Sequence, residues 1–183
     1  MRLYHSIARR LSMLVTAGAV MLLAACSTID RGASPSLERQ ASWVVLPFVN
    51  HTETPMAGSR AESIAQALLQ AQGVGTVRRA PTGTQKDALF GAQDNARMDD
   101  ALTWAREQKV RYALAGSVDE WRYKVGVDGE PAAGVTLSIL DVATGDTLWS
   151  GTGGRSGWSR QALSAVAQQL IRDLLQSGLA DAR

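Results

Sequence analysis

The sequence has little of the chemistry that disulfides and metal sites require. There is one cysteine, Cys26, and there are two histidines, His5 and His51. A single thiol excludes an internal disulfide and a site with several cysteine ligands, and two histidines exclude a histidine-rich metal cluster. The apolar residues 11–25 also fall short of the roughly 20 that a transmembrane helix needs.

What is present is the composition of one globular domain. The chain has 183 residues, of which 45% are hydrophobic and 20% are charged. This balance excludes wholesale disorder and a fibrous architecture. A chain of this length buries about two-thirds of its unfolded surface without help from metals or disulfides, but it cannot hold two full cores.

The amino terminus has the layout of a secretion signal. Three arginines and no acid precede the uncharged residues 11–25, and the small residues Ala24 and Ala25 lead to Cys26. This segment resembles a lipoprotein signal peptide with its lipobox. The resemblance implies that residues 1–25 are removed and that Cys26 then carries a thioether-linked diacylglycerol and an N-acyl chain such as palmitate. Several acyl chains on one residue would hold the protein firmly at a membrane.

The residue after this cysteine bears on which membrane is meant. In lipoproteins an aspartate at that place usually marks retention in the inner membrane, so Ser27 resembles the signal for transfer to the periplasmic face of the outer membrane. The alternative reading of Cys26 is a buried structural cysteine.

The basic charge of the chain belongs to this leader. Cleavage after residue 25 removes three of the 19 basic residues and none of the 17 acidic residues, which changes the net charge from +2 to −1. A slightly acidic mature chain gives no argument for nucleic acid as a partner, and it leaves room for a local acidic surface.

Hydrophobic periodicity predicts a flexible tether over residues 26–41 and a single α/β (α+β) domain over residues 42–183. The predicted order is βαβαβββα, with a mixed sheet against which the helices pack. The predicted strands are 43–49, 74–79, 111–125, 133–142 and 147–152, and the predicted helices run from a capping box at 59–62 to Gly73, over 95–108 and over 159–175. Residues 80–93 are predicted to be a loop, and residues 141–146 a tight hairpin turn.

Candidates for catalysis are weak. His51 is the only histidine left after the leader, so a Ser-His-Asp triad has one possible base. Glycine-rich residues 151–157 lack the lysine and spacing of a phosphate loop and predict a strand-to-helix turn. The pairs Asp99-Asp100 and Asp119-Glu120 are adjacent in sequence, so their side chains are expected to point in different directions. No catalytic residue, metal ligand or cofactor is predicted.

Aromatic residues of the carboxy-terminal half are more informative. Trp121, Tyr123, Trp149 and Trp158 lie within forty residues of one another, and strand alternation places Asp119, Trp121 and Tyr123 on one face. Packing in the core is one interpretation for each tryptophan. A membrane-interface belt and a sugar-stacking platform are the alternatives.

Four stretches together resemble one family. Residues 44–55, 113–124, 127–131 and 141–151 are similar to the PelC family, outer-membrane lipoproteins of Pel exopolysaccharide export. The strand end with Pro47, Phe48, Asn50 and Thr52 is shared more widely with the amino-terminal domain of TolB, the curli-secretion lipoprotein and the activator lipoproteins of penicillin-binding proteins. The segment 119–131 is what favours the PelC family.

The resemblance implies a non-enzymatic role in biofilm matrix formation. About a dozen subunits would form a ring under the outer membrane and work with PelB, a porin with a periplasmic repeat region. An acidic funnel would attract the Pel polysaccharide, a partly deacetylated and cationic polymer, and an aromatic belt would face the membrane. The residues expected in these roles are Trp149 and Trp158 for the belt and Asp119, Glu120, Asp128 and Glu130 for the acidic surface.

Two other classes of function remain open at this point. The first is a lipoprotein regulator that docks onto a peptidoglycan synthase, but its members carry longer tethers than one of about 15 residues, which reaches at most about 50 Å. The second is a hydrolase that acts on the polymer. The shortage of histidines and of facing carboxylates disfavours it.

Overall fold

The computed structural model describes residues 27–81, 92–126 and 129–183, with no account of the side chains of residues 92–95. The expected signal peptide, Cys26, Asp128 and most of the expected loop 80–93 lie outside these described residues. The strands are β1 (Ser27–Arg31), β2 (Trp43–Val45), β3 (Val49–Asn50), β4 (Val77–Arg79), β5 (Tyr112–Tyr123), β6 (Pro131–Asp141) and β7 (Thr147–Ser156), and the helices are α2 (Ala57–Ala71), α3 (Ala92–Glu107) and α4 (Leu163–Gly178).

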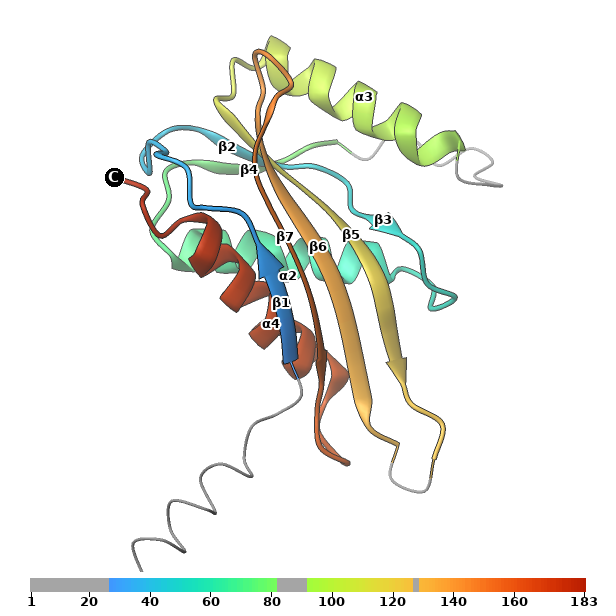
Figure 1. Ribbon diagram of the computed structural model, residues 1–183. Helices are drawn as coiled ribbons and strands as arrows, with labels where there is room; N and C mark the ends of the chain where they lie inside the picture. The colour runs from blue at the N-terminus through green and yellow to red at the C-terminus, as the bar shows by residue number, and fades with distance from the viewer. Residues whose placement is uncertain (1–26, 82–91, 127–128) are drawn as a thin grey trace, which may run out of the picture.

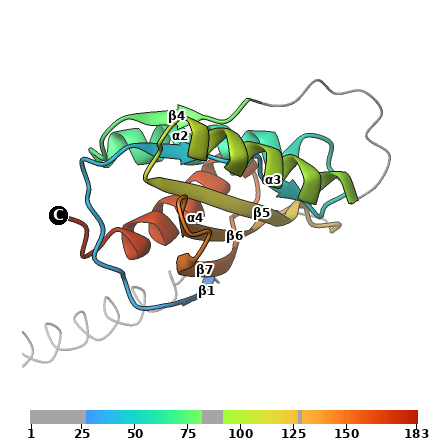
Figure 2. The ribbon, with the colours of Figure 1, turned by 90° about the horizontal axis from the view of Figure 1, so that it is seen from above.

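These strands form one mixed sheet in the order β1-β7-β6-β5-β2-β4, and β3 also pairs with β5. The pairs β2–β4, β2–β5 and β3–β5 are parallel, whereas β5–β6, β6–β7 and β7–β1 are antiparallel. Helices α2 and α4 cover one face, and α3 crosses part of the other (Figures 1 and 2). The predicted α+β class with a mixed sheet is confirmed.

The strand β2 shows why its sequence is continuously apolar. Trp43 and Val45 belong to the larger core under α2 and α4, and Val44 and Leu46 belong to a second core under α3. All four side chains are fully buried, and each contributes about 1.5–3 kcal/mol by leaving water. Pro47 then interrupts the strand, because it has no N–H for the sheet. Val45 pairs with Leu114 and Val49 with Ser117, so this segment has one more residue than the part of β5 beside it.

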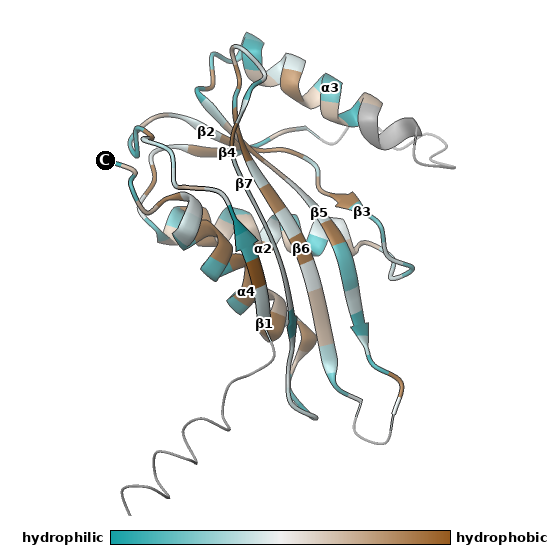
Figure 3. Cartoon of the chain, viewed as in Figure 1, coloured by the Kyte–Doolittle hydropathy of each residue, from teal (hydrophilic) through white to brown (hydrophobic). Residues whose placement is uncertain are grey.

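Where α3 ends, the face opposite α2 and α4 is left uncovered. We call the part of this face formed by Ser117, Thr136, Ser138, Ser150 and Thr152 the open face. Along β6 the residues Val135, Leu137 and Ile139 are buried while Thr136 and Ser138 are only half-buried, and the same alternation appears as bands of hydropathy (Figure 3). Such alternation is typical of an antiparallel sheet with one face in water.

The segment expected to be a tether is instead part of the domain. Strand β1 pairs with β7 in five register positions, from Ser27 opposite Arg155 to Arg31 opposite Gly151. Leu37 is buried, and its carbonyl accepts a hydrogen bond from the Arg183 N–H at 2.9 Å. The prediction is therefore wrong for residues 27–41. Leu37 belongs to the core and Ile29 and Ala41 pack against it, but three apolar residues at uneven spacing give no periodic signal.

The glycine-rich residues before α4 also differ from the prediction. Strand β7 continues to Ser156, and α4 begins at Leu163 rather than near residue 159. A Cβ atom at Gly153 would lie 2.9 Å from Cδ1 of Leu170, and one at Gly151 would lie 2.7 Å from the Trp149 ring. Glycine is needed here because α4 packs directly on the strand, so these residues are part of the sheet and not a turn.

The turn between β6 and β7 agrees with its prediction from sequence. The hairpin turn at 141–146 is confirmed: Oδ1 of Asp141 accepts the N–H groups of Ala143 at 2.9 Å and Thr144 at 3.3 Å, and Gly145 has φ 82°. Asp141 also pairs with Arg111 at 2.8 Å. The Tyr112 side chain and then Asp141 hold the pKa of Arg111 above its usual value.

The predicted capping box at 59–62 is wrong. Helix α2 begins two residues earlier, after Met56 with φ 61°, and it has no side-chain cap. Glu62 is buried instead and pairs with Arg79 of β4.

Candidate functional site

A β-bulge in β5 brings two carboxylates to the open face. The pairing with β6 shifts between Val118, opposite Val135, and Glu120, opposite Gly134, so Asp119 is an extra residue. Asp119 contacts Thr136 on the open face. Glu120 lies on the same face, because a Cβ atom built on Gly134 would be 3.2 Å from its Cβ. The expectation that these adjacent side chains diverge is therefore wrong.

The same bulge separates Asp119 from the aromatic residue two positions on. Trp121 is buried in the core under α2 and α4, whereas Asp119 is on the open face. Simple alternation predicted one shared face for the two, and it fails because a bulge adds one residue between them.

Asp119 is held by three partners. A carboxylate only accepts hydrogen bonds, so Nδ1–H of His51 donates to Oδ1 at 2.9 Å, and the Ser117 hydroxyl donates to the same atom at 3.3 Å. The Thr136 hydroxyl donates to Oδ2 at 3.1 Å. Thr136 is in turn hydrogen-bonded to the Thr152 hydroxyl at 2.9 Å. The result is a fixed polar chain that crosses β5, β6 and β7.

The residues of the widely shared motif at the end of β3 hold the loop that contains His51 in place. The Asn50 side chain donates to the Thr54 carbonyl at 2.9 Å and accepts from the N–H and the hydroxyl of Thr52 at 3.1 and 2.8 Å. The Thr54 hydroxyl donates to the Trp121 carbonyl at 2.6 Å. These bonds pin the loop to β5 and set the position of His51.

This geometry holds a carboxylate but does not assemble a triad. The Ser117 and Thr136 hydroxyls contact the carboxylate of Asp119, not the imidazole of His51, so neither is placed as a nucleophile beside a base. No three His, Cys, Asp or Glu side chains come together as a metal site among the described residues. Within the same residues, no helix has the length and apolar character needed to cross a bilayer.

Comparison with known proteins identifies the family. A scan of protein-family models and a sequence search of curated proteins found no match. Among solved structures, a subunit of the PelC dodecamer from Paraburkholderia phytofirmans superposes with a TM-score of 0.71 at 44% identity, over 86% of this chain and 99% of that one. The chain belongs to the PelC family. A point variant of the same dodecamer gives a TM-score of 0.72 at 44% identity over the same shares.

The fold extends beyond the PelC family. Lipoprotein GNA1162 from Neisseria meningitidis has a TM-score of 0.52 at 17% identity, over 74% of this chain and 96% of that one. At this identity the likeness concerns the fold alone.

In this PelC-family chain, the expectation that Trp149 faces the membrane is wrong. Trp149 is only 3% exposed. Its Nε1–H donates to the Gly32 carbonyl at 3.3 Å, and Cβ atoms at Gly151 or Gly178 would lie within 3 Å of its ring. Trp149 is therefore a core residue between β7, α4 and the segment after β1, and it cannot face a membrane in this structure.

The expected acidic residues of the PelC-family chain are only partly brought together. Asp119 and Glu120 share the open face, but Glu120 pairs with Arg122 at 2.9 Å. Glu130 is exposed at the other end of the loop that joins β5 to β6. Asp128, in the same loop, lies outside the described residues.

Three of the large apolar side chains that are exposed among the described residues lie around the ends of β5 and β7. Trp158 is 64% and Tyr123 52% exposed, and Val125 is fully exposed, whereas Met56, at 68%, lies apart from them at the start of α2. Tyr123 pairs with Pro131, whose carbonyl accepts the N–H of Gly157 at 2.8 Å. We call the surface formed by Tyr123, Val125, Pro131 and Trp158 the basal end; the loop between β5 and β6 lies there, at the bottom of Figure 1. Of its members, only Trp158 is predicted as a membrane residue from sequence, because no periodicity marks exposed residues in turns.

Proposed function

We propose that this protein is a non-enzymatic outer-membrane lipoprotein that assists export of a cationic exopolysaccharide of the Pel type for the biofilm matrix. Its subunits would form a ring that guides the polymer to the PelB porin. The observation that carries the proposal is the 44% identity to PelC over 99% of the solved subunit. The lipobox-like segment that ends at Cys26 supports the lipid anchor.

The ring has a direct test. The solved relative is a dodecamer, and a ring of that kind needs a heterologous contact that closes on itself. We expect the mature protein, lipidated and in detergent micelles, to sediment as one species of about twelve subunits after correction for bound detergent. A strict monomer at high protein concentration would contradict the ring.

Acidic residues on this ring would attract the polymer over a distance. Surface carboxylates act by summed, screened attraction, and each contributes about 0.5–1 kcal/mol. We expect Glu130→Gln to weaken retention of purified Pel polymer about two- to five-fold at 50 mM salt, and to have no effect at about 0.5 M salt, where the Debye length falls to a few ångströms.

The matched control for Glu130 is Asp146→Asn. Asp146 is an exposed acid in the turn between β6 and β7, at the opposite end of the strands. Retention that falls equally in both variants would show a general charge effect and contradict a specific acidic surface at Glu130.

The basal end is the surface we propose to meet the outer membrane. Ser27 lies opposite Arg155, one residue before Ser156, whose hydroxyl accepts a hydrogen bond from Lys124 at 2.6 Å. Cys26 precedes Ser27 in the sequence, so a lipid on Cys26 would attach near this end, where Trp158, Tyr123 and Val125 are exposed. Trp and Tyr have an apolar ring and a polar group, which suits the headgroup region of a bilayer.

The regulator of a peptidoglycan synthase is not favoured. That function requires a tether long enough to reach away from the membrane, whereas β1 starts directly after Cys26. The domain would therefore sit at the membrane surface.

A further inference from the structure

A cleft of about 630 Å³ lies between the segment that follows the proposed anchor and the carboxy-terminal half of α4. Its walls are fixed at several points. The Gly32 N–H donates to the Ser150 carbonyl at 3.0 Å, and the Ser34 hydroxyl donates to the Gly178 carbonyl at 3.3 Å and accepts the Asp181 N–H at 3.1 Å. The cleft is thus a feature of packed elements and not of a loose segment.

Polar side chains with free capacity surround this cleft. Arg31, Gln176 and Ser177 line it, and their side chains make no hydrogen bond or ion pair with a described residue. Asp173 also lines it. Arg155 donates to its Oδ2 at 2.8 Å, and no described residue donates a hydrogen bond to its Oδ1. Four groups that can donate to or accept from a ligand therefore share one cleft, beside small apolar residues such as Ala33 and Ala180.

The chemistry of the lining limits the ligand. A lipid tail would leave the charged and polar groups without partners, which costs free energy for each. A strong anion would be repelled by the carboxylate of Asp173, and a cation without other polar groups would be repelled by the guanidinium of Arg31. A ligand that presents hydroxyls, an amide and an ammonium group satisfies all four side chains, and the volume lies in the range of small-molecule sites.

We propose that this cleft binds an amino-sugar unit of the exported polysaccharide, an inference that rests on the proposed function. The carboxylate of Asp173 receives the ammonium group of a deacetylated unit, and Arg31, Gln176 and Ser177 receive hydroxyl and acetamide groups. Oδ1 of Asp173 is the atom available to the ammonium, because Arg155 donates to Oδ2. The binding step is non-covalent.

The test uses oligosaccharide probes and the mature lipidated protein in detergent micelles. Glucosamine hexamer and its fully N-acetylated counterpart are titrated by calorimetry. We expect Asp173→Asn to weaken binding of the glucosamine hexamer about five- to tenfold and to leave the N-acetylated hexamer almost unchanged, because only the first carries the ammonium groups. Asparagine can still accept the Arg155 hydrogen bond, so the domain should stay folded.

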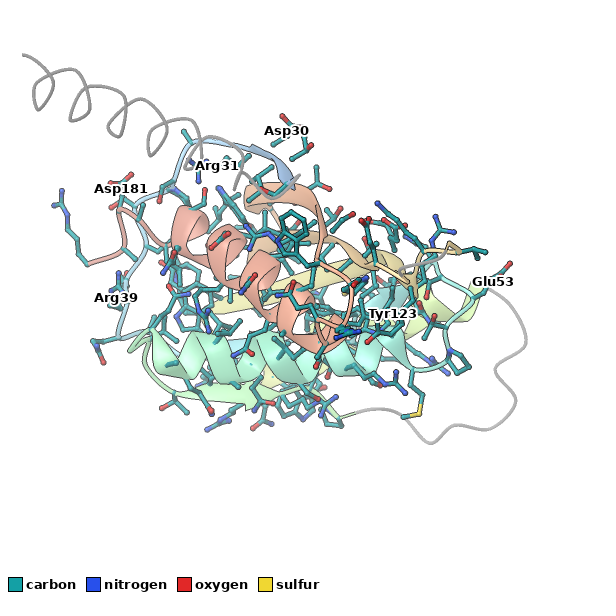
Figure 4. All side chains as sticks on the ribbon, turned by 90° about the horizontal axis from the view of Figure 1, so that it is seen from below. Asp30, Arg31, Arg39, Glu53, Tyr123 and Asp181 are labelled. Carbon is teal, nitrogen blue, oxygen red and sulfur yellow. The ribbon has the colours of Figure 1, made fainter. Side chains whose placement is uncertain are left out.

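The matched control is Asp30→Asn. Asp30 is the neighbour of Arg31 in β1, is exposed, and points away from α4 (Figure 4), so this variant removes the same charge from the opposite side of the strand. Equal losses in Asp30→Asn and Asp173→Asn, or no loss in Asp173→Asn, would overturn the proposal. If Asp173→Asn is unfolded, Gln176→Ala is tested in its place, because this exposed side chain makes no hydrogen bond that the substitution would remove. Weaker binding of both hexamers to Gln176→Ala would support the cleft, and unchanged binding would overturn it.

The outcome for the cleft is separate from that for the export role. Polymer secretion in cells that lack the protein tests the export role, and hexamer binding tests the cleft. Normal secretion in such cells together with loss of binding in Asp173→Asn would contradict the proposed function and support a saccharide cleft. Lost secretion together with unchanged binding in Asp173→Asn would support the function and overturn the cleft.

Discussion

Cys26→Ser is expected to release the protein from the outer membrane into the periplasmic fraction and to abolish secretion of the polymer. Serine has no thiol to carry the diacylglycerol, and each acyl methylene that no longer enters the bilayer removes about 0.8 kcal/mol of membrane affinity. Fractionation of cells and quantification of secreted polymer measure the two effects. The change lies next to β1 but outside it, so the folded domain should be unaffected.

The control for this variant is Thr28→Ser, which keeps Cys26 and changes an exposed residue of β1. It should localise and secrete as the unchanged protein does. A soluble Cys26→Ser protein that supports normal secretion would rule out the need for an anchored ring.

The two tryptophans expected in one belt should behave in opposite ways. Trp149→Ala is expected to lower the free energy of unfolding by about 3–5 kcal/mol, because it leaves a cavity among β7, α4 and Gly32. That is a large part of the 5–15 kcal/mol typical of a domain. Trp158→Ala, at an exposed position, should change it by less than about 0.5 kcal/mol. Urea unfolding of the mature protein followed by circular dichroism gives both values.

Contact with the membrane should depend on Trp158 and not on Trp149. Vesicles of phosphatidylethanolamine and phosphatidylglycerol with brominated acyl chains should quench part of the tryptophan fluorescence, and Trp158→Ala should remove most of that quenching. Quenching that persists in Trp158→Ala would contradict the assignment of the basal end to the membrane. A small loss of stability in Trp149→Ala would contradict its place in the core.

Several parts of the fold were predictable because their causes are local. The apolar run from Trp43 to Leu46 indicates burial on both faces, and two separate cores confirm it. The turn at 141–146 follows from an aspartate and a glycine with left-handed φ. The family could also be recognised, since the residues from 119 to 131 are distinctive, and the solved PelC subunit confirms it.

Other parts depend on contacts that a sequence pattern does not contain. Strand β1 forms because β7 offers it an edge, and Ile29 is the one apolar residue among its five. The burial of Trp149 depends in turn on the segment after β1, which supplies the carbonyl of Gly32. The common face of Asp119 and Glu120 depends on one extra residue in the pairing of β5 with β6. A single bulge inverts the alternation from which faces are predicted.

The pairing of β1 with β7 has a mechanical consequence for an anchored protein. If lipid holds the chain just before Ser27, any pull of the domain away from the membrane acts along the axis of β1. The five register positions from Ser27 to Arg31 then carry the force side by side, in shear, and must separate together. A strand peeled from its end would lose its hydrogen bonds one at a time. An edge strand paired in this way would let a lipid attachment resist tension.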